Sequence, residues 1–395
     1  MDLVKGRAVV KFGGADLSSG ENIRKAAEMV VKSGYWEIAV VVSAMGKTTD
    51  DLIETMSQIG EVSDREYADT VSMGERTSAR LFASALRAQG APATYLEPSM
   101  EGWPIITDSN YREAKPDMEE TSTRVRRFLE PLLGKTIPVV CGFLGIDKAG
   151  SVTTLGRGGS DTTAVLLGNC LRAEEVILVK DTRGVMSADP KVVPDAKPLE
   201  SLSIQEMLAL AQGGAKIVKA EALTYKLPEQ KLRIVSFSKG LRSPETEITG
   251  DLHSSSFEIR ERQRLAAISL LSEINSENLS ALFSRLKEKP IYGVSTGAGS
   301  VTVFTSLEGA KEILKDLHGL GLFKAVSSRE GVGMIELMHP VFINSPGWTA
   351  KLSGALASRN VNVIEITTNR SSINIFVDES QLDYAIKAVR DAIET

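Results

Sequence analysis

The chain has 395 residues, of which 42% are hydrophobic and 25% charged, with a formal net charge of −5. This length favours two or three domains, and the composition is that of an ordinary globular protein. The small negative charge excludes a general electrostatic attraction to nucleic acid or to anionic lipid. No basic stripe with interleaved aromatic residues indicates a nucleic-acid interface either.

Two further classes are excluded by the distribution of residue types. No apolar run reaches the length of a membrane-spanning helix, and residues 1–7 are not followed by the apolar core of a signal peptide. The three histidines lie far apart in the sequence, so no metal cluster is expected. We therefore expect a cytoplasmic protein with no membrane partner, no nucleic-acid partner and no metal site of its own.

Up to residue 257, short apolar runs alternate with helical patterns. The runs are rich in β-branched residues, which is typical of strands buried on both faces of a parallel sheet. Helices between such strands cover the two faces. We therefore predict an α/β domain over residues 1–257, a sandwich with a mainly parallel central sheet. The predicted strands are 8–10, 38–42, 137–141, 176–179 and 233–237, and the predicted helices include 22–33, 72–86 and 164–171.

Beyond residue 257 the sequence contains a duplicated pattern. The segment Ser300–Phe304 has a counterpart in Ser372–Phe376, and each follows a helix and a strand and precedes a second helix. This order predicts two βαββαβ modules, with the last strand of one or both shared or missing. A single irregular α+β domain is the alternative. We assign residues 258–330 to the first module, including a charged linker at 258–264, and residues 331–395 to the second.

Two glycine-rich segments carry the main chemical signal. Lys11-Phe12-Gly13-Gly14 follows the first strand, where backbone N–H groups and a helix N-terminus can bind phosphate. Lys11 could reach the β- and γ-phosphates of a nucleotide, although the motif alone fits an ordinary strand-to-helix turn better. The segment 153–164 is more specific, because glycines, Arg157 and Asp161 stand directly before an apolar helix. Arg157 suits a bidentate grip on a carboxylate, and Asp161 can cap the helix, position Lys11, or both.

Other polar residues follow predicted strands or begin helices. The segment Ser43–Thr49 lies where a parallel strand ends, which is where ligands bind in such sheets. Its Gly-Lys-Thr is not a P-loop, because the earlier glycine of that motif is absent. Glu75 begins a helix and either binds a ligand or only stabilises the helix dipole. The segment 180–191 after the strand 176–179 is placed to hold a base and ribose.

Together and in this order, the segments resemble the aspartate kinase family of the amino-acid kinase superfamily, over nearly the whole chain. The segment Thr154–Asp161 carries the most specific motif. The C-terminal pair resembles ACT domains, which typically bind amino acids in this family. The resemblance implies an amino-acid-kinase-type αβα sandwich followed by α+β ferredoxin-like ACT modules. The other matching segments are 10–14, 41–46 with 49–50, 74–76, 189–191 and 214–216.

The resemblance also implies a reaction and partners. The reaction is ATP-dependent phosphorylation of the side-chain carboxylate of L-aspartate to 4-phospho-L-aspartate, with Mg²⁺ accompanying ATP. This reaction is the first step from aspartate towards lysine, threonine and methionine. The ACT modules imply a homo-oligomer and an amino-acid effector. Two alternatives remain: a related kinase that acts on glutamate or N-acetylglutamate, and a regulatory amino-acid-binding homologue that has lost catalysis.

Roles for individual residues follow from the same resemblance. Lys11 and Asp161 would be catalytic, with Asp161 orienting Lys11. Arg157 would bind the α-carboxylate of the substrate and Glu75 its α-ammonium, in a pocket completed by Thr49, Ser43, Ala44, Phe143 and Ser160. ATP would contact Lys11, Gly13, Gly14, Ser43, Gly158, Gly159, Lys180, Asp181, Lys191 and Lys216. An effector would bind near Asn344, Pro346 and Gly347.

Three segments depart from the family pattern. Ala15-Asp16 follows the glycine pair where the family has two hydroxyl residues, which adds a carboxylate near the phosphates. Arg183 and Met186 replace an acid and a tyrosine in the nucleotide segment. In the first module, residues 273–276 lack the acidic-x-Pro-Gly loop, whereas the second module keeps Asn-Ser-Pro-Gly at 344–347.

Overall fold

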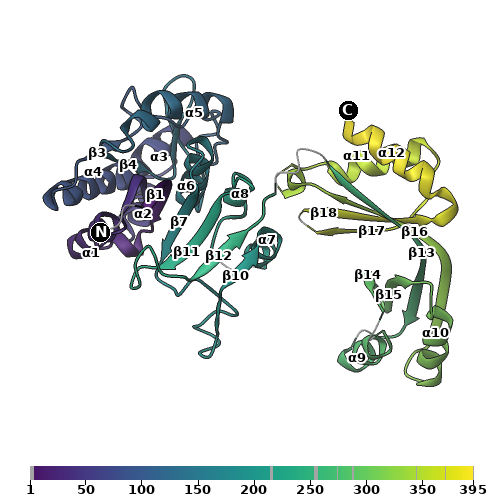
Figure 1. Cartoon of the computed structure of the whole chain (residues 1–395). Helices are drawn as coiled ribbons and strands as arrows, with labels where there is room; N and C mark the ends of the chain where they lie inside the picture. The colour runs from purple at the N-terminus through teal and green to yellow at the C-terminus, as the bar shows by residue number, and fades with distance from the viewer. Residues whose placement is uncertain are drawn as a thin grey trace. The chain divides into compact units, whose positions relative to one another are not determined.

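The computed structural model describes residues 4–213, 217–252, 257–273, 275–286, 289–343, 345–369 and 371–394. The chain divides into two units, Met1–His253 and Ser254–Thr395. Each unit has its own sheet and helices (Figure 1).

The central sheet of the first unit has the strand order β10-β12-β11-β7-β1-β2-β4-β3 among the described residues. Neighbouring strands are parallel except for β11 and β12, which run antiparallel. The predicted α/β class with a mainly parallel sheet is therefore confirmed. The strands are β1 (Val4–Phe12), β2 (Tyr35–Val42), β3 (Ala93–Leu96), β4 (Ile137–Cys141), β7 (Glu175–Lys180), β10 (Ser201–Ser203), β11 (Lys231–Ser236) and β12 (Thr246–Thr249).

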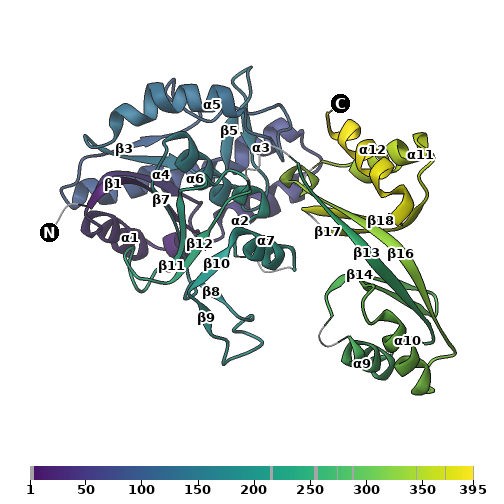
Figure 2. The same ribbon diagram turned by 45° about the vertical axis from the view of Figure 1, so that its right-hand side comes forward.

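Helices cover both faces of this sheet. Consecutive residues of a strand point to opposite faces, yet Val9 and Val10 of β1 are both fully buried. The ring of Phe12 contacts Phe82 on one face, whereas Lys11 reaches an ion-pair partner on a helix of the other. The helices are α1 (Gly20–Lys32), α2 (Thr48–Ile59), α3 (Asp64–Val71), α4 (Met73–Ala88), α5 (Met118–Arg124), α6 (Gly159–Cys170), α7 (Ile204–Gln212) and α8 (Ala220–Leu223) (Figure 2).

Short elements complete the first unit. Two small antiparallel pairs lie outside the central sheet, β5 (Leu144–Ile146) with β6 (Val152–Thr154) and β8 (Val185–Met186) with β9 (Pro198–Leu199). A single 3-10 turn, η1 (Ala15–Leu17), lies between β1 and α1. A π-helical turn occurs at η2 (Val125–Leu129), and a further 3-10 turn follows at η3 (Glu130–Leu132).

The second unit contains a sheet with the order β14-β15-β13-β16-β18-β17 among its described residues. Its strands are β13 (Glu258–Leu271), β14 (Ile291–Gly297), β15 (Ser300–Ser306), β16 (Ala325–Met338), β17 (Val363–Asn369) and β18 (Ser372–Asp378). Its helices are α9 (Ser276–Arg285), α10 (Ala310–Gly319), α11 (Trp348–Ser358) and α12 (Leu382–Glu394), with short turns η4 (Pro340–Ile343) and η5 (Glu379–Gln381).

The two modules of this unit share their long central strands. Residues 265–271 of β13 pair with 325–332 of β16, and residues 258–262 pair with 334–338. Each module therefore contains half of β13 and half of β16. Both modules have the strand order of a βαββαβ unit. The predicted linker at 258–264 is wrong, because these residues begin β13. The position 330/331, predicted as a boundary, lies inside β16.

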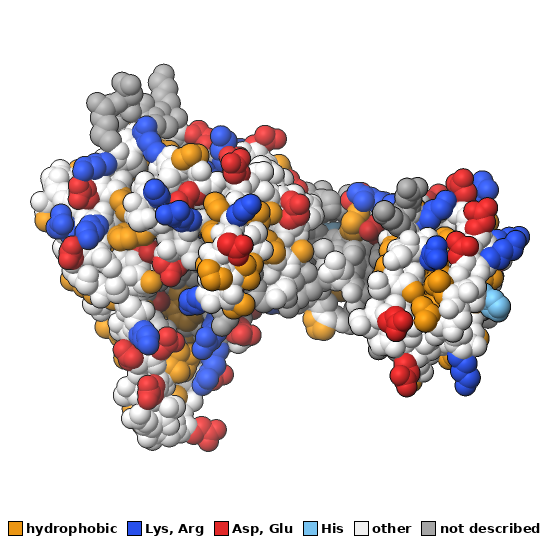
Figure 3. Space-filling view, turned by 90° about the horizontal axis from the view of Figure 1, so that it is seen from below, with side chains coloured by type: hydrophobic (Ala, Val, Ile, Leu, Met, Phe, Trp, Pro, Cys, Tyr) orange, Lys and Arg blue, Asp and Glu red, His pale blue; other side chains and the backbone are white. Residues whose placement is uncertain are grey.

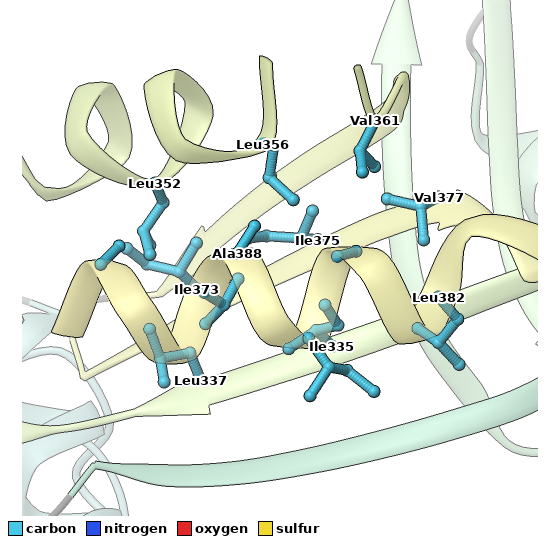
Figure 4. Packing of buried hydrophobic residues seen from close by; sticks show 14 residues of the cluster. Ile335, Leu337, Leu352, Leu356, Val361, Ile373, Ile375, Val377, Leu382 and Ala388 are labelled. Atoms are coloured by element: carbon cyan, nitrogen blue, oxygen red, sulfur yellow. The ribbon is translucent and has the colours of Figure 1, made fainter. Parts of the chain in front are cut away.

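The helical face of this sheet carries the apolar core of each module. Leu352 and Leu356 of α11 and Ala388 of α12 pack on Ile335 and Ile375 in the second module (Figure 4). Helices α9 and α10 bury a separate cluster in the first module. The opposite face of the sheet carries a third apolar cluster. The edge strands β14 and β17 contact each other.

The surface shows no dominance of one charge sign on the face drawn in Figure 3, where basic and acidic side chains are interspersed. Within the described residues, none of the helices combines the length and the apolar character needed to cross a membrane.

Candidate active site

A cluster of two lysines and one aspartate lies at the carboxyl ends of two neighbouring strands. Lys11 comes from the end of β1 and Lys180 from the end of β7, while Asp161 lies in the first turn of α6. The Nζ atom of Lys11 is 2.7 Å from Oδ1 of Asp161, and that of Lys180 is 2.8 Å from Oδ2. One carboxylate therefore fixes two ammonium groups at the sheet edge where ligands bind in parallel sheets.

Burial and the charges of the ion-pair partners act in opposite directions on the pKa values of Asp161 and Lys11. Burial alone would raise the pKa of Asp161, but the charges of Lys11 and Lys180 outweigh it and lower the pKa to about 2. Burial lowers the pKa of Lys11, and the charge of Asp161 opposes that shift. The cluster is thus held together by ion pairs in a largely buried region, where unpaired charges are costly.

The glycine turn after β1 is shaped by its contacts with the turn after β2. A Cβ atom on Gly14 would lie 2.9 Å from the carbonyl oxygens of Ala44 and Gly46, so only glycine fits there. Gly46 also donates its N–H to the carbonyl of Gly14 at 2.9 Å. The amide of Gly13 donates to Oδ2 of Asp16 at 3.1 Å, which is a contact that the sequence did not predict.

Glu75 lies in the first turn of α4 and is 3% exposed. Its Oε1 accepts the N–H of Ala44 at 3.2 Å and lies 3.5 Å from the hydroxyl of Thr49. Within the described part of the chain, its Oε2 is buried without a hydrogen-bond partner. Burial raises the pKa of Glu75 to about 7, against the effect of these hydrogen bonds. The helix begins this close because Gly74 lacks a Cβ, which would stand 2.7 Å from that of Ala44.

Ser43 and Ala44 continue from β2 into this region. The N–H of Ser43 donates to the carbonyl of Phe12, which ties the end of β2 to the end of β1. Ser43, Ala44, Thr49 and Glu75, predicted from separate segments, are therefore brought together.

A second wall is built by the turn after β4 and the start of α6. Phe143 has a φ of 70°, a conformation that non-glycine residues seldom adopt, and its N–H donates to the hydroxyl of Thr163. A Cβ on Gly142 would lie 2.7 Å from the side chain of Ser160, and one on Gly159 would lie 2.9 Å from the ring of Phe143. These close approaches bring together the two substrate-pocket residues predicted on this side, Phe143 and Ser160.

The glycine-rich segment starts α6 earlier than predicted. The helix begins at Gly159 instead of residue 164, after Gly158 in a left-handed conformation with φ of 77°. Arg157 is exposed in the turn. Lys219, which the sequence did not indicate, packs on Gly158 and donates from Nζ to the carbonyl of Leu155 at 3.1 Å.

The remaining nucleotide residues form no compact cluster in the described part of the chain. Asp181 and Lys191 are both exposed, and the N–H of Lys191 donates to the side chain of Asp189. The segment 185–186 is anchored by Thr246, whose hydroxyl accepts the N–H of Val185 at 2.8 Å. Lys216 lies outside the described residues.

The predicted effector segment precedes α11 in the second module. Gly347 has φ of 93° and Pro346 is exposed, while Asn344 lies outside the described residues. In the first module, Asn278 donates from Nδ2 to the hydroxyl of Ser272 and to the carbonyl of Glu273. The cavity beside these residues measures about 10 Å³.

Metal binding by side chains alone is not supported in the part of the chain that the structure describes. No group of three or more His, Cys, Asp or Glu side chains in it is arranged to hold a metal ion.

Comparisons with known proteins agree with this geometry. Residues 6–236 match the amino acid kinase family model, and residues 341–393 match an ACT domain model. The aspartokinase of Corynebacterium glutamicum is 34% identical over 411 residues, covering 98% of this chain and 96% of that protein. The aspartokinase of Bacillus sp. (strain MGA3) is 31% identical over 409 residues, covering 98% and 97% respectively. The crystal structure of aspartate kinase from Synechocystis superposes with a TM-score of 0.71 at 25% identity, covering 98% of this chain and 70% of that one.

The fold and the matched family model define the class as amino acid kinases. Within that class, the chain belongs to the aspartokinase family. The family resemblance stated from the sequence motifs is thereby confirmed.

Proposed function

We propose that this chain uses ATP to phosphorylate the side-chain carboxylate of L-aspartate, as membership of the aspartokinase family indicates. The observation that carries the proposed site is the buried cluster of Lys11, Asp161 and Lys180 beside the Gly13–Gly14 turn. Two ammonium groups held rigidly at the carboxyl edge of a parallel sheet are suited to the triphosphate of a nucleotide.

The chemistry that these residues must supply is modest. The side chain of aspartate has an ordinary pKa of about 3.9, so it is ionised at pH 7 and needs no general base. Transfer requires in-line positioning and neutralisation of charge on the γ-phosphate. Lys11 and Lys180 would provide the positive charge, and Asp161 would hold both ammonium groups in place.

The amino-acid pocket would recognise the two α-groups of the substrate. The Oε2 of Glu75, which has no hydrogen-bond partner among the described residues, would accept a hydrogen bond from the α-ammonium. Arg157 would bind the α-carboxylate, with Thr49 and Phe143 shaping the pocket. An N-acylated acceptor has no ammonium group and would leave Glu75 buried without a partner, which favours a free amino acid.

Magnesium would arrive with the phosphates of ATP. No three-carboxylate cluster in the described residues would hold the ion by itself, so the phosphates would provide most of its ligands. Once bound, the ion would neutralise part of the charge on the triphosphate. Asp181, Lys191 and Lys216 are assigned to the nucleotide on family resemblance.

The second unit would regulate the enzyme. We assign catalysis to the first unit, Met1–His253, and regulation to the two ACT-like modules of the second unit, Ser254–Thr395, which share β13 and β16. An amino-acid effector would bind near Asn344, Pro346 and Gly347, and the modules would pair between chains in a homo-oligomer. Calorimetric titration with lysine, threonine and methionine, together with light scattering, tests both assignments.

Steady-state kinetics of Arg157→Ala test the substrate assignment. Because Arg157 is exposed, its removal should leave the fold intact while the KM for aspartate rises on the order of tenfold or more, with little change in the KM for ATP. Arg157→Lys keeps the charge but not the bidentate geometry and should recover only part of the loss. An unchanged KM for aspartate in Arg157→Ala would remove this residue from the pocket.

A further inference from the structure

The phosphate-binding turn of this chain contains an acid, Asp16, where the family pattern has a hydroxyl residue. Asp16 is the middle residue of η1 and is only 3% exposed. Its Oδ2 accepts the N–H of Gly13 at 3.1 Å. This amide is one of the backbone donors expected to bind the transferred phosphoryl group.

We propose that the carboxylate of Asp16 is an internal anion that competes with the phosphates of ATP for the amide of Gly13. The proposal rests on the proposed function, because it assigns a second role to the same phosphate site. A single N–H group makes one strong hydrogen bond, so the carboxylate and a phosphate oxygen cannot both occupy it.

The positions of nearby charges support this competition. A Cβ atom on Gly13 would stand 3.3 Å from Oδ2 of Asp16 and 3.7 Å from Nζ of Lys11, so both groups flank the same glycine. Lys11 and Lys180 contribute two positive charges here, and Asp161, Asp16 and Asp181 contribute three negative ones. Without nucleotide, these side chains therefore carry a net negative charge, and an incoming phosphate meets one carboxylate more than the reaction needs.

The charged groups facing Asp16 are Lys11 from β1 and Lys180 and Asp181 from the end of β7. The turn Ser43–Gly46 packed against Gly14 contains no charged residue. Burial raises the pKa of Asp16, and the Gly13 N–H and the charge of Lys11 oppose the shift without cancelling it. ATP can thus gain access to the amide when Asp16 takes up a proton, because the neutral acid no longer repels the phosphate.

Substitution of Asp16 by asparagine removes the negative charge and keeps the shape of the side chain. Asp16→Asn is close in size and can still accept the Gly13 N–H through its amide oxygen, so the turn is retained without the anion. We expect a non-hydrolysable ATP analogue with Mg²⁺ to bind Asp16→Asn about tenfold tighter than the unsubstituted chain at pH 8.5. The ratio of the two affinities should approach one as the pH falls and Asp16 becomes protonated.

Isothermal titration calorimetry of the full chain measures both parts of this expectation. Titrations in buffers of different ionisation enthalpy should show more proton uptake on binding by the unsubstituted chain than by Asp16→Asn. Adenosine, which has no phosphate, should bind the two proteins equally. Glu21→Gln removes an exposed carboxylate of α1 that pairs with Lys25, and it should bind the ATP analogue like the unsubstituted chain.

The outcomes separate this proposal from the proposed function. If neither the unsubstituted chain nor any variant binds the ATP analogue, both the present proposal and the proposed function fail. If Asp16→Asn folds and binds it equally or more weakly, with equal proton uptake, Asp16 does not compete and only the present proposal fails. Asp16→Ser, whose hydroxyl also accepts the amide, must show the same gain in affinity as Asp16→Asn. If neither variant folds by circular dichroism, the carboxylate is a structural cap and the proposal is overturned.

Discussion

The Nζ atom of Lys11 lies 2.7 Å from Oδ1 of Asp161, and the two side chains are only 8% and 7% exposed. They come from β1 and from the first turn of α6, which are distant in sequence. Because Lys180 binds the other oxygen of the same carboxylate, Asp161 ties two strand ends to one helix start. The ion-pair network therefore supports both the stability of the first unit and the geometry of the phosphate site.

Substitution of Asp161 by asparagine should affect stability and turnover together. The amide cannot neutralise the buried ammonium of Lys11 and the partly buried ammonium of Lys180, so the free energy of unfolding should fall by about 3 kcal/mol. Turnover should fall on the order of a hundredfold or more, because Lys11 and Lys180 lose their fixed positions. Urea unfolding and a coupled kinase assay measure the two effects, with Glu21→Gln as the matched control. Normal turnover in a folded Asp161→Asn protein would contradict the role assigned to this residue.

The pKa of about 7 for Glu75 predicts a pH dependence of aspartate use. Only the ionised carboxylate attracts the α-ammonium, so lowering the pH through 7 neutralises Glu75 and weakens binding. At saturating ATP, kcat/KM for aspartate should fall roughly fivefold from pH 7 to pH 6 and level off well above pH 7.

Glu75→Gln provides the control for this profile. It should use aspartate poorly and show no such dependence between pH 6 and pH 8. If the glutamine variant keeps the same profile as the unsubstituted chain, another group is responsible.

Much of the first unit could be predicted from local sequence. The predicted strand 137–141 has the same bounds as β4, because a short apolar run rich in β-branched residues favours a buried strand. The charged residues of the segment 258–264 are typical of a solvated linker, yet the segment begins β13. Pairing with β16, a distant segment, makes it part of β13, and no local pattern reveals that partner.

The residues of the candidate site could be predicted one by one from the sequence, but the contacts between them could not. Family motifs indicated Lys11, Lys180 and Asp161, yet the sharing of one carboxylate by two lysines depends on where three separate elements end. The sequence showed that Asp16 was unusual, but not that it is buried on the amide of Gly13. Lys219 carried no signal, because a lone lysine before a short helix is most often exposed.

The second unit offers a matched pair of glycine substitutions. Phe304 and Phe376 stack with ring centroids 3.8 Å apart, and a Cβ on Gly293 would lie 2.8 Å from the ring of Phe376. Gly293→Ala should therefore destabilise this unit by about 1–3 kcal/mol through overpacking. Gly354 lies within α11 with open space around its Cβ position, so Gly354→Ala should stabilise by about 0.5–1 kcal/mol.

Urea unfolding followed by circular dichroism and tryptophan fluorescence, with Trp348 in this unit, measures both changes. If Gly293→Ala and Gly354→Ala changed the free energy of unfolding equally, Phe376 would not occupy the space beside Gly293.

The central claim, that the Lys11–Asp161–Lys180 cluster transfers phosphate from ATP to the side chain of aspartate, is tested most directly by trapping the product. Acyl phosphate reacts with hydroxylamine to give a hydroxamate, which forms a coloured complex with added Fe³⁺, so purified chain, ATP and Mg²⁺ can be assayed with aspartate, glutamate and N-acetylglutamate side by side. We predict hydroxamate with aspartate, little with the other two, and a loss of several orders of magnitude in Lys11→Ala. A stronger signal with another acceptor, or an undiminished signal in Lys11→Ala, would contradict the claim.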